Sequence, residues 1–357
     1  MDAPRGTVFL TGANGGLGNA IVKQLAASPP ANSSSLANYY GLYAVRDAAA
    51  APALRSTLAN CPSTTDRHRH EILSLDLTEL DSVRQTAKAV SARVAAGELP
   101  PIRALILNAG YQNLHGQTLG TDGLDHSFTV NYLGHWLLAL LLLESMDKAC
   151  GRIVVVGSDA HDPQSKLNIT IRPVLPVDET LIPDQASFEA LANGTWGSAS
   201  DPLWRAGYRR YAAAKLCAMT MVHELQHRLA ADPILSRVCV LAVDPGYMST
   251  GLQRHAPWIV RLVIFQVLLP LGAWLMPGGP IRSPETSATH VLRAALDADL
   301  GPGTGSGQLP RALYFDGAEL AETSVEAKDE GKRQLIWTET VRLTGLRKAE
   351  TILHDLE

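Results

Sequence analysis

The sequence predicts an α/β fold, a doubly wound parallel sheet with helices on both faces. Six short runs of apolar and β-branched residues lack the strict alternation of a half-exposed strand, so we expect them to be buried on both sides. Helical patterns separate these runs, and a Gly-rich turn joins the first run to the first helix. The 357 residues, 46% of them hydrophobic, suffice for one large unit with a sizeable core.

The predicted elements follow one another in a regular order. The first strand, 7–10, leads through the Gly-rich turn into a helix over 19–27. Further strands are predicted at 40–45, 71–75, 104–107, 152–156 and 238–243, with a helix over 80–95 after the third strand. Each strand ends in turn-forming or polar residues, and the carboxyl ends of parallel strands share one edge. We therefore expect the functional site at that edge.

Three stretches are additions to this core. We predict a single domain over 1–357, with the core at about 5–255 and an irregular, lid-like insertion at about 159–205. A substrate-cover segment is expected at about 250–285, and a closing pair of helices at about 318–357. Gln266 and Pro270 interrupt the apolar run 257–276, whereas a membrane-spanning helix needs about 20 mostly apolar residues. We expect this run to cover a pocket, and docking to a membrane surface stays open.

Composition argues against several classes of protein. Lys and Arg number 31 against 35 Asp and Glu, so we expect no nucleic-acid partner. The four cysteines, Cys61, Cys150, Cys217 and Cys239, form no CxxC pair, which argues against a disulfide framework and against a structural metal site. No secretion signal is visible at the N-terminus. A cytoplasmic location is expected, at the periphery of a membrane if 257–276 docks there.

The Gly-rich turn predicts a dinucleotide site. Gly12-x3-Gly16-x-Gly18 lies between a strand and a helix, where backbone N–H groups approach a pyrophosphate with no Cβ in the way. Such turns also occur as plain connections. The second strand ends at Arg46, which favours the 2′-phosphate of NADP(H), while Asp47 beside it keeps NAD(H) open through a ribose hydroxyl.

Tyr211 and Lys215 form the strongest catalytic motif. Their spacing of four residues puts a phenol and an ammonium on one face of a helix. A protonated lysine beside a phenol favours the phenolate and lowers the tyrosine pKa from about 10. Ser158 ends a strand at the edge where ligands bind in open α/β folds. Each feature alone is common in helices and turns, and their combination indicates acid–base chemistry.

In this order the residues resemble the short-chain dehydrogenase/reductase family, which has a Rossmann-type fold. The resemblance rests on Thr11-Gly12-x3-Gly16-x-Gly18, Asp76-Leu77, Asn108-Ala109-Gly110, Val130-Asn131-Tyr132-Leu133-Gly134-His135, Ser158, Tyr211-x3-Lys215 and Asp244-Pro245-Gly246. The C-terminal part, around Tyr314-Phe315 and Gln334-Leu335-Ile336-Trp337, is similar to the retinol dehydrogenase and protochlorophyllide reductase-like members. Fungal ketosteroid and secondary-metabolite ketoreductases share much of this layout.

The resemblance implies an NADPH-dependent ketoreductase, or the matching alcohol dehydrogenase, for a bulky hydrophobic substrate such as a polyketide, terpenoid, steroid or retinoid. Tyr211 is implied to exchange a proton with the substrate oxygen, and Lys215 to lower its pKa and hold the nicotinamide ribose. Ser158 is implied to hydrogen-bond the substrate oxygen, and Asn131 to keep a water in the relay. The implied cofactor residues are Gly12, Asn14, Gly16, Leu17, Gly18, Arg46, Asp76, Leu77, Asn108, Ala109, Gly110, Tyr211, Lys215, Pro245, Gly246 and Thr250.

Several alternatives stay open. The same cofactor and Tyr–Lys pair serve reduction of a conjugated C=C bond, and a cofactor-bound scaffold without turnover is a further reading. The insertion must loop out for Ser158 to meet Tyr211, and otherwise Asp159 or Ser165 takes the place of Ser158. The resemblance also implies a homo-oligomer through the Tyr211 helix and the helix near Asp125, an interface that the extra C-terminal helices would obstruct.

Overall fold

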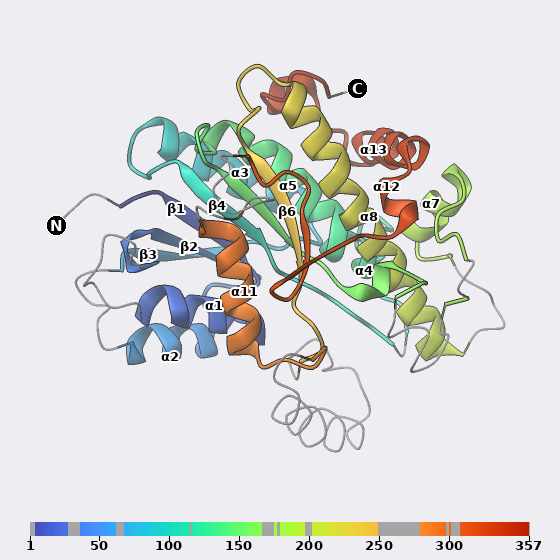
Figure 1. Cartoon of the computed structure of the whole chain (residues 1–357), viewed down its shortest axis with the longest axis horizontal. Coiled ribbons are helices and arrows are strands. Elements are labelled where there is room, and N and C mark those ends of the chain that lie inside the picture. Colours follow the sequence, from blue (N-terminus) through green and yellow to red (C-terminus); the bar gives the residue numbers. More distant parts are fainter. Residues whose placement is uncertain are drawn as a thin grey trace.

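An eight-stranded sheet runs through the centre of the molecule (Figure 1). The structure, a computed structural model, describes residues 4–27, 36–61, 68–114, 116–165, 175–176, 179–196, 202–248, 279–297, 300 and 308–356. The strands are β1 (Thr7–Thr11), β2 (Tyr40–Val45), β3 (His70–Ser74), β4 (Ile102–Leu107), β5 (Arg152–Val156), β6 (Cys239–Asp244), β7 (Tyr314–Asp316) and β8 (Glu319–Ala321). Their order in the sheet is β3-β2-β1-β4-β5-β6-β7-β8.

The predicted doubly wound parallel sheet is confirmed. The six predicted strands are β1 to β6, and they pair in parallel through consecutive apolar residues. Two additions were not predicted. β7 extends the parallel sheet, and β8 returns beside it in the antiparallel direction. Both are three residues long, which is too short for an apolar run to stand out in the sequence.

Helices cover both faces of the sheet (Figure 1). They are α1 (Gly16–Ala27), α2 (Pro52–Asn60), α3 (Leu80–Ala95), α4 (His126–Phe128), α5 (Gly134–Leu142), α7 (Gln185–Ala192), α8 (Leu203–Ala231), α11 (Pro284–Leu296), α12 (Val325–Lys328) and α13 (Glu330–Thr344). One core lies between the sheet and α1, α2 and α11. The larger core lies under α3, α5 and α8, and α13 packs on the outer side of α8. The strands β1, β2, β4, β5 and β6 are buried almost throughout, so the functional groups gather at their ends. The edge strand β3 is only half-buried, contrary to the prediction, because it has a neighbouring strand on one side alone.

The insertion and the C-terminal extension are fastened to each other. The carboxylate of Glu326 accepts the backbone N–H groups of Leu181 and Ile182, at 2.9 and 2.8 Å. Lys332 Nζ donates to the carbonyl oxygen of Ile182 at 2.8 Å, and Phe188 of α7 is fully buried. The described part of the insertion thus contains a helix, whereas an irregular segment was predicted. The extension contains two helices, as predicted, but of unequal length: α12 is a single turn and α13 is long.

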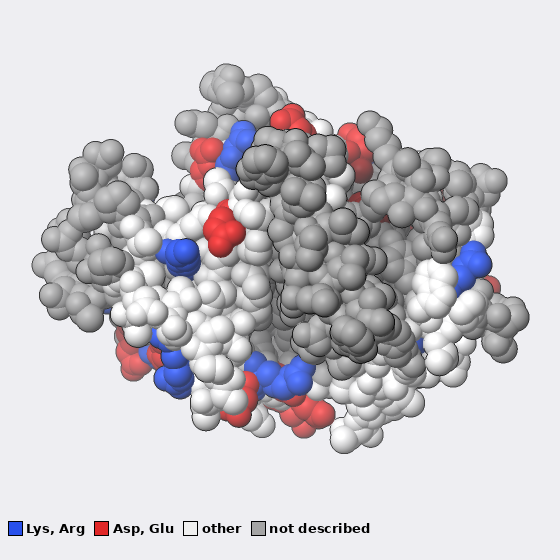
Figure 2. Space-filling model, turned by 90° about the horizontal axis from the view of Figure 1, so that it is seen from below, with Lys and Arg blue, Asp and Glu red and all other residues white. Residues whose placement is uncertain are grey.

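The predicted pocket cover falls largely outside the described residues, which omit 249–278. Nothing structural is therefore said of the run 257–276. Within the described ranges, no helix is both long and apolar enough to cross a membrane. The four cysteines are free thiols. On the face shown in Figure 2, the acidic and basic side chains of the described residues are interspersed.

Candidate active site

A cleft of about 680 Å³ opens at the carboxyl edge of the sheet. It is lined by nearly all of the residues predicted to bind cofactor or substrate: Gly12, Asn14, Gly16, Leu17, Gly18, Arg46, Asp76, Leu77, Asn108, Ala109, Gly110, Ser158, Tyr211, Lys215, Pro245 and Gly246. Two predicted residues are not in this set. Thr250 lies outside the described residues, and Asn131 is buried behind the lining. The motifs of the sequence therefore converge on one cleft.

The Gly-rich turn leaves no room for side chains. Gly12 has φ +69°, and a Cβ there would lie 2.8 Å from Cα of Ala109. A Cβ on Gly18 would collide with the carbonyl oxygen of Gly12. The chain can therefore turn tightly into α1, and residues at the start of this helix, where backbone N–H groups can bind an anion, line the cleft. A dinucleotide pyrophosphate fits this cradle.

Neutral side chains hold the backbone around this turn. Thr11 Oγ1 accepts the backbone N–H groups of Asn108 and Ala109, at 2.9 and 3.0 Å. Asn108 Nδ2 donates back to the carbonyl oxygen of Thr11 at 2.8 Å, which ties the ends of β1 and β4 together. His135 Nε2 lies 2.9 Å from Thr11 Oγ1, and burial lowers the pKa of His135 to about 3. Uncharged groups thus fix the cofactor side of the cleft.

Asn14 and Asp76 also serve local structure. Asn14 Oδ1 accepts the backbone N–H of Leu54 at 3.0 Å, in the first turn of α2. Asp76 Oδ1 accepts the backbone N–H and the hydroxyl of Thr78, at 2.9 and 2.7 Å. Both residues line the cleft, but these side-chain oxygens already have partners. Their predicted contacts with the cofactor stay predictions.

Arg46 stands at the rim of the cleft. Its side chain is 66% exposed, and Nε lies 3.9 Å from a carboxylate oxygen of Asp76. At that separation and exposure the ion pair is weak. The neighbouring Asp47 uses a carboxylate oxygen to accept the backbone N–H of Ala49 at 2.8 Å. Arg46 therefore offers the cleft a cation, while the Asp47 carboxylate is partly engaged in its own turn.

Ser158 and Tyr211 meet, as the looped-out insertion requires. Both side chains line the cleft, and the Ser158 hydroxyl acts on the Tyr211 phenol by lowering its pKa. Ser158 Oγ accepts the backbone N–H of Ala160 at 3.2 Å. Lys215 follows one turn later on α8, with Nζ 5.7 Å from the centre of the Tyr211 ring. Lys215 Nζ donates to the carbonyl oxygen of Val156 at 2.9 Å. The three residues form one cluster between β5 and α8, in which Tyr211 and Lys215 are buried and Ser158 is half-buried.

The predicted direction of the Tyr211 pKa shift is wrong for this structure. Burial raises the Tyr211 pKa, and the hydrogen bond from Ser158 offsets only part of that rise. Burial also lowers the pKa of Lys215 to about 8. The expectation of a lowered tyrosine pKa considered the charge of lysine but not the loss of water around both groups. The phenol of Tyr211 is therefore held in its protonated form.

Comparison with known proteins agrees with this arrangement. The model of the short chain dehydrogenase family matches residues 6–168. The short-chain dehydrogenase iccH of Talaromyces variabilis is 42% identical over 374 residues, which cover 99% of each chain. The chain belongs to the short-chain dehydrogenase/reductase family.

More distant relatives and solved structures agree with the membership in this family. Retinol dehydrogenase 13 of Mus musculus is 29% identical, and the match covers 97% of this chain and 86% of the relative. The chloroplastic protochlorophyllide reductase of Pisum sativum is 28% identical, with 96% and 78% covered. The angucycline C-6 ketoreductase LanV with bound NADP has a TM-score of 0.55 at 17% identity, with 91% and 96% covered, which supports the shared fold.

In this short-chain dehydrogenase/reductase, Asn131 lies in a π-helical turn, η2 (Thr129–Leu133), between α4 and α5. Its amide Nδ2 donates to the carbonyl oxygens of Ser127 and Tyr111, both at 2.7 Å, and its Oδ1 accepts the Tyr111 N–H at 3.3 Å. The side chain thus clamps the segment that follows Gly110. The role of holding a relay water stays a prediction, since these side-chain atoms are bonded to backbone.

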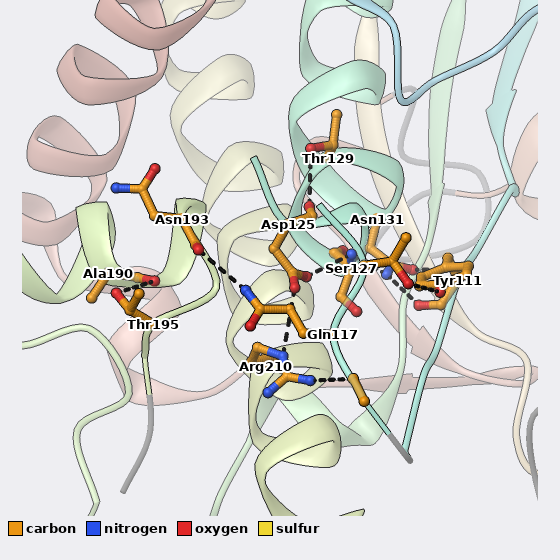
Figure 3. Close-up of polar contacts among 12 residues, drawn as sticks. Tyr111, Gln117, Asp125, Ser127, Thr129, Asn131, Ala190, Asn193, Thr195 and Arg210 are labelled. Atoms are coloured by element: carbon orange, nitrogen blue, oxygen red, sulfur yellow. Dashed lines mark hydrogen bonds and ion pairs between the residues drawn. The ribbon is translucent and has the colours of Figure 1, made fainter. Parts of the chain in front are cut away.

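A buried ion pair joins the helices that carry the predicted catalytic residues (Figure 3). Arg210, next to Tyr211, has Nε 3.6 Å from Oδ2 of Asp125, with side chains only 8% and 2% exposed. Asp125 also caps α4 by accepting the backbone N–H of Ser127 at 2.7 Å. Arg210 Nη2 donates to the carbonyl oxygen of Gly116 at 2.7 Å. The pair ties α8 to the segment that leads to Asn131.

Several residues of this family member were given no role by the motif analysis, or, in the case of Asp159, only a substitute role for Ser158. Asp159, Tyr208 and Tyr247 line the cleft, and Tyr247 Oη donates to Asp159 Oδ1 at 3.1 Å. His161 is buried, with Nδ1 2.6 Å from the carbonyl oxygen of Ser158, while Nε2 accepts the backbone N–H of Ser324 at 3.1 Å. Their one sequence signal is position, because each lies within a few residues of a recognised motif.

Proposed function

We propose that this oxidoreductase uses NADP(H) to reduce the carbonyl group of a bulky hydrophobic compound, or to oxidise the matching alcohol. The observation that carries the proposal is the joining of Ser158, Tyr211 and Lys215 in one cleft with the Gly-rich turn. When bound, the cofactor supplies or accepts the hydride. The relatives' names and the NADP in the LanV structure add support.

The chain's own residues account for the proton. Because burial raises the pKa of Tyr211, its phenol stays protonated and serves as a general acid toward a carbonyl oxygen. Ser158 Oγ accepts from Ala160, so its own O–H can stabilise the developing negative charge on that oxygen. Lys215 uses one of its N–H groups on Val156 and offers the rest to the ribose hydroxyls. A protonated Tyr211 and a Ser158 hydroxyl free to donate favour carbonyl reduction over alcohol oxidation.

Arg46 supports NADP(H) over NAD(H). It is a weakly paired cation at the end of β2, where a guanidinium binds a 2′-phosphate through charge-assisted hydrogen bonds. The cytoplasmic location, the small hydrophobic partner and a homo-oligomer belong to this proposal as well. In the described part of the chain, α13 and α12 pack against α8, the helix through which such an oligomer would form.

The test is NADPH oxidation with hydrophobic ketones, using wild type, Tyr211→Phe and a matched Tyr40→Phe control outside the cleft. We expect Tyr211→Phe to lower kcat by about 10²- to 10⁴-fold, the usual contribution of a positioned acid, with NADPH affinity unchanged. Tyr40→Phe should behave as wild type. If Tyr211→Phe kept the wild-type turnover rate, Tyr211 could not be the general acid.

The same assay separates the alternatives. An enone panel with product analysis distinguishes C=O from C=C reduction, because the two products differ in which bond remains. NADPH binding without turnover of any carbonyl compound would favour the scaffold reading.

A further inference from the structure

We propose that Asp159 and Tyr247 bind a second oxygen of the substrate, a hydroxyl or carbonyl group other than the one that reacts. The inference rests on the proposed function, since it places the reacting carbonyl at Ser158 and Tyr211. It narrows the substrate class to ketones that carry a further oxygen close to the reacting carbonyl.

Two neighbouring strands bring this pair together. Asp159 directly follows Ser158 after β5, and Tyr247 directly follows Gly246 after β6. Since β5 and β6 pair in parallel, the loops after them meet at the same edge of the sheet. Tyr247 Oη donates to Asp159 Oδ1 at 3.1 Å and lies 3.4 Å from Oδ2. Both residues line the cleft.

The pair lies beside the residues assigned to the reaction. Consecutive Cα atoms are about 3.8 Å apart, so the Asp159 and Ser158 backbones are adjacent. Tyr208, one turn before Tyr211 on α8, lines the cleft together with Tyr247, and the rings of Tyr208 and Tyr211 have centroids 6.5 Å apart. Polar groups therefore continue from the Ser158–Tyr211 pair along one wall of the cleft. A second oxygen on a substrate held at the first pair could therefore reach the second pair.

The carboxyl group of Asp159 can serve as either a donor or an acceptor toward a ligand. Asp159 is largely removed from water, and its surroundings contain the Asp244 carboxyl from β6 and the Asp316 carboxyl from β7. Burial and Asp244 together raise the Asp159 pKa to about 7, and the hydrogen bonds from Tyr247 and Ser158 offset only part of the rise. Facing a ligand cleft, the same group can donate when protonated and accept when ionised, so either a carbonyl or a hydroxyl fits.

The test uses 1-tetralone and its 5-, 6-, 7- and 8-hydroxy derivatives, which place one hydroxyl at different positions relative to the same carbonyl. Calorimetry on the full chain with NADP⁺, which cannot reduce a ketone, measures binding without turnover. We expect the best-placed hydroxy isomer to bind about tenfold more tightly than 1-tetralone, as one hydrogen bond to a carboxyl group allows. Asp159→Ala should abolish this preference, and the near-isosteric Asp159→Asn should retain part of it.

Asp162→Asn is the matched control, because Asp162 lies in the same loop but does not line the cleft. It should keep the wild-type preference, and thermal unfolding verifies that all variants are folded. Equal binding of all isomers, no binding of any, or a preference that persists in Asp159→Ala would overturn the inference. Turnover with NADPH is read separately. Reduction of 1-tetralone and its derivatives at equal rates supports the proposed function and rejects this inference. A binding preference that depends on Asp159, without any reduction, supports this inference and rejects the proposed function.

Discussion

The two sides of the cleft are built by different means. On the cofactor side, at the ends of β1 and β4, neutral side chains such as Thr11 and Asn108 hold the backbone, and the backbone forms the surface. On the proposed substrate side, after β5 and β6, the surface includes buried or half-buried ionisable side chains, among them Asp159, Tyr211 and Lys215. The first side depends on shape, and the second depends on protonation states that burial has shifted.

This difference teaches where substitutions act. On the cofactor side a change in backbone packing alters binding at any pH, because uncharged groups maintain the surface. On the substrate side, a change in packing alters how far each ionisable side chain is buried, and therefore its pKa and protonation state. The following experiments can break or sharpen that division.

The largest effect is expected at the buried pair of Arg210 and Asp125. Arg210→Met leaves the carboxylate of Asp125 buried without its cation, so we expect the free energy of unfolding to fall by about 3 kcal/mol. Burial already raises the pKa of Asp125, which shows that the partner compensates only in part. Urea unfolding measures the loss.

Two further variants control this experiment. Asp125→Asn combined with Arg210→Met removes both charges and should recover part of the stability. Arg93→Met removes a partly exposed pair with Glu71 and should cost about 1 kcal/mol or less. NADPH affinity of the folded Arg210→Met protein should stay at the wild-type value. If Arg210→Met weakened NADPH binding by as much free energy as it removed from folding stability, the two sides of the cleft would not be independent.

The second effect is the pH dependence contributed by Lys215. Its folded pKa, about 8, lies below its unfolded value, so the unfolded chain binds more protons between the two values. The free-energy cost of burying the Lys215 ammonium is therefore greatest below pH 8 and decreases as the pH rises above 8. Wild type should gain about 2 kcal/mol over Lys215→Met between pH 7 and pH 9.5, measured without cofactor. A stability difference that stays constant over this range would contradict the assigned shift.

The smallest effect is expected at Arg46, on the exposed rim of the cofactor side. Arg46→Ala should raise the Kd for NADPH about tenfold and leave the Kd for NADH unchanged, since only NADPH carries the 2′-phosphate. Fluorescence titration measures both constants. Asp47→Asn is the matched control and should change neither. Weaker NADH binding in Asp47→Asn would instead place Asp47 at the ribose and make NAD(H) the cofactor.

Much of the fold and of the cofactor side follows from local sequence. Strands 40–45 and 152–156 were predicted at their observed bounds, because a buried parallel strand is a continuous apolar run. The Gly12–Gly18 turn is equally local. The Asp125–Arg210 pair and the Asp159–Tyr247 contact join residues that are 85 and 88 positions apart, and no short pattern encodes them. The direction of the Tyr211 pKa shift was predicted wrongly for the same reason, because the burial that raises this pKa arises from the packing of distant segments.

The link from His161 to Ser324 has a consequence for how the protein is made. Synthesis proceeds from the N-terminus, so a growing chain contains β1 to β4 and the Gly-rich turn long before residue 324 leaves the ribosome. The backbone N–H of Ser324 and the carboxylate of Glu326 come from the last part of the chain, and they hold the loop after Ser158 and the segment at Leu181. A nascent chain thus has the parts of its nucleotide-binding edge early, and it acquires the final supports of its reacting groups only when translation is nearly complete.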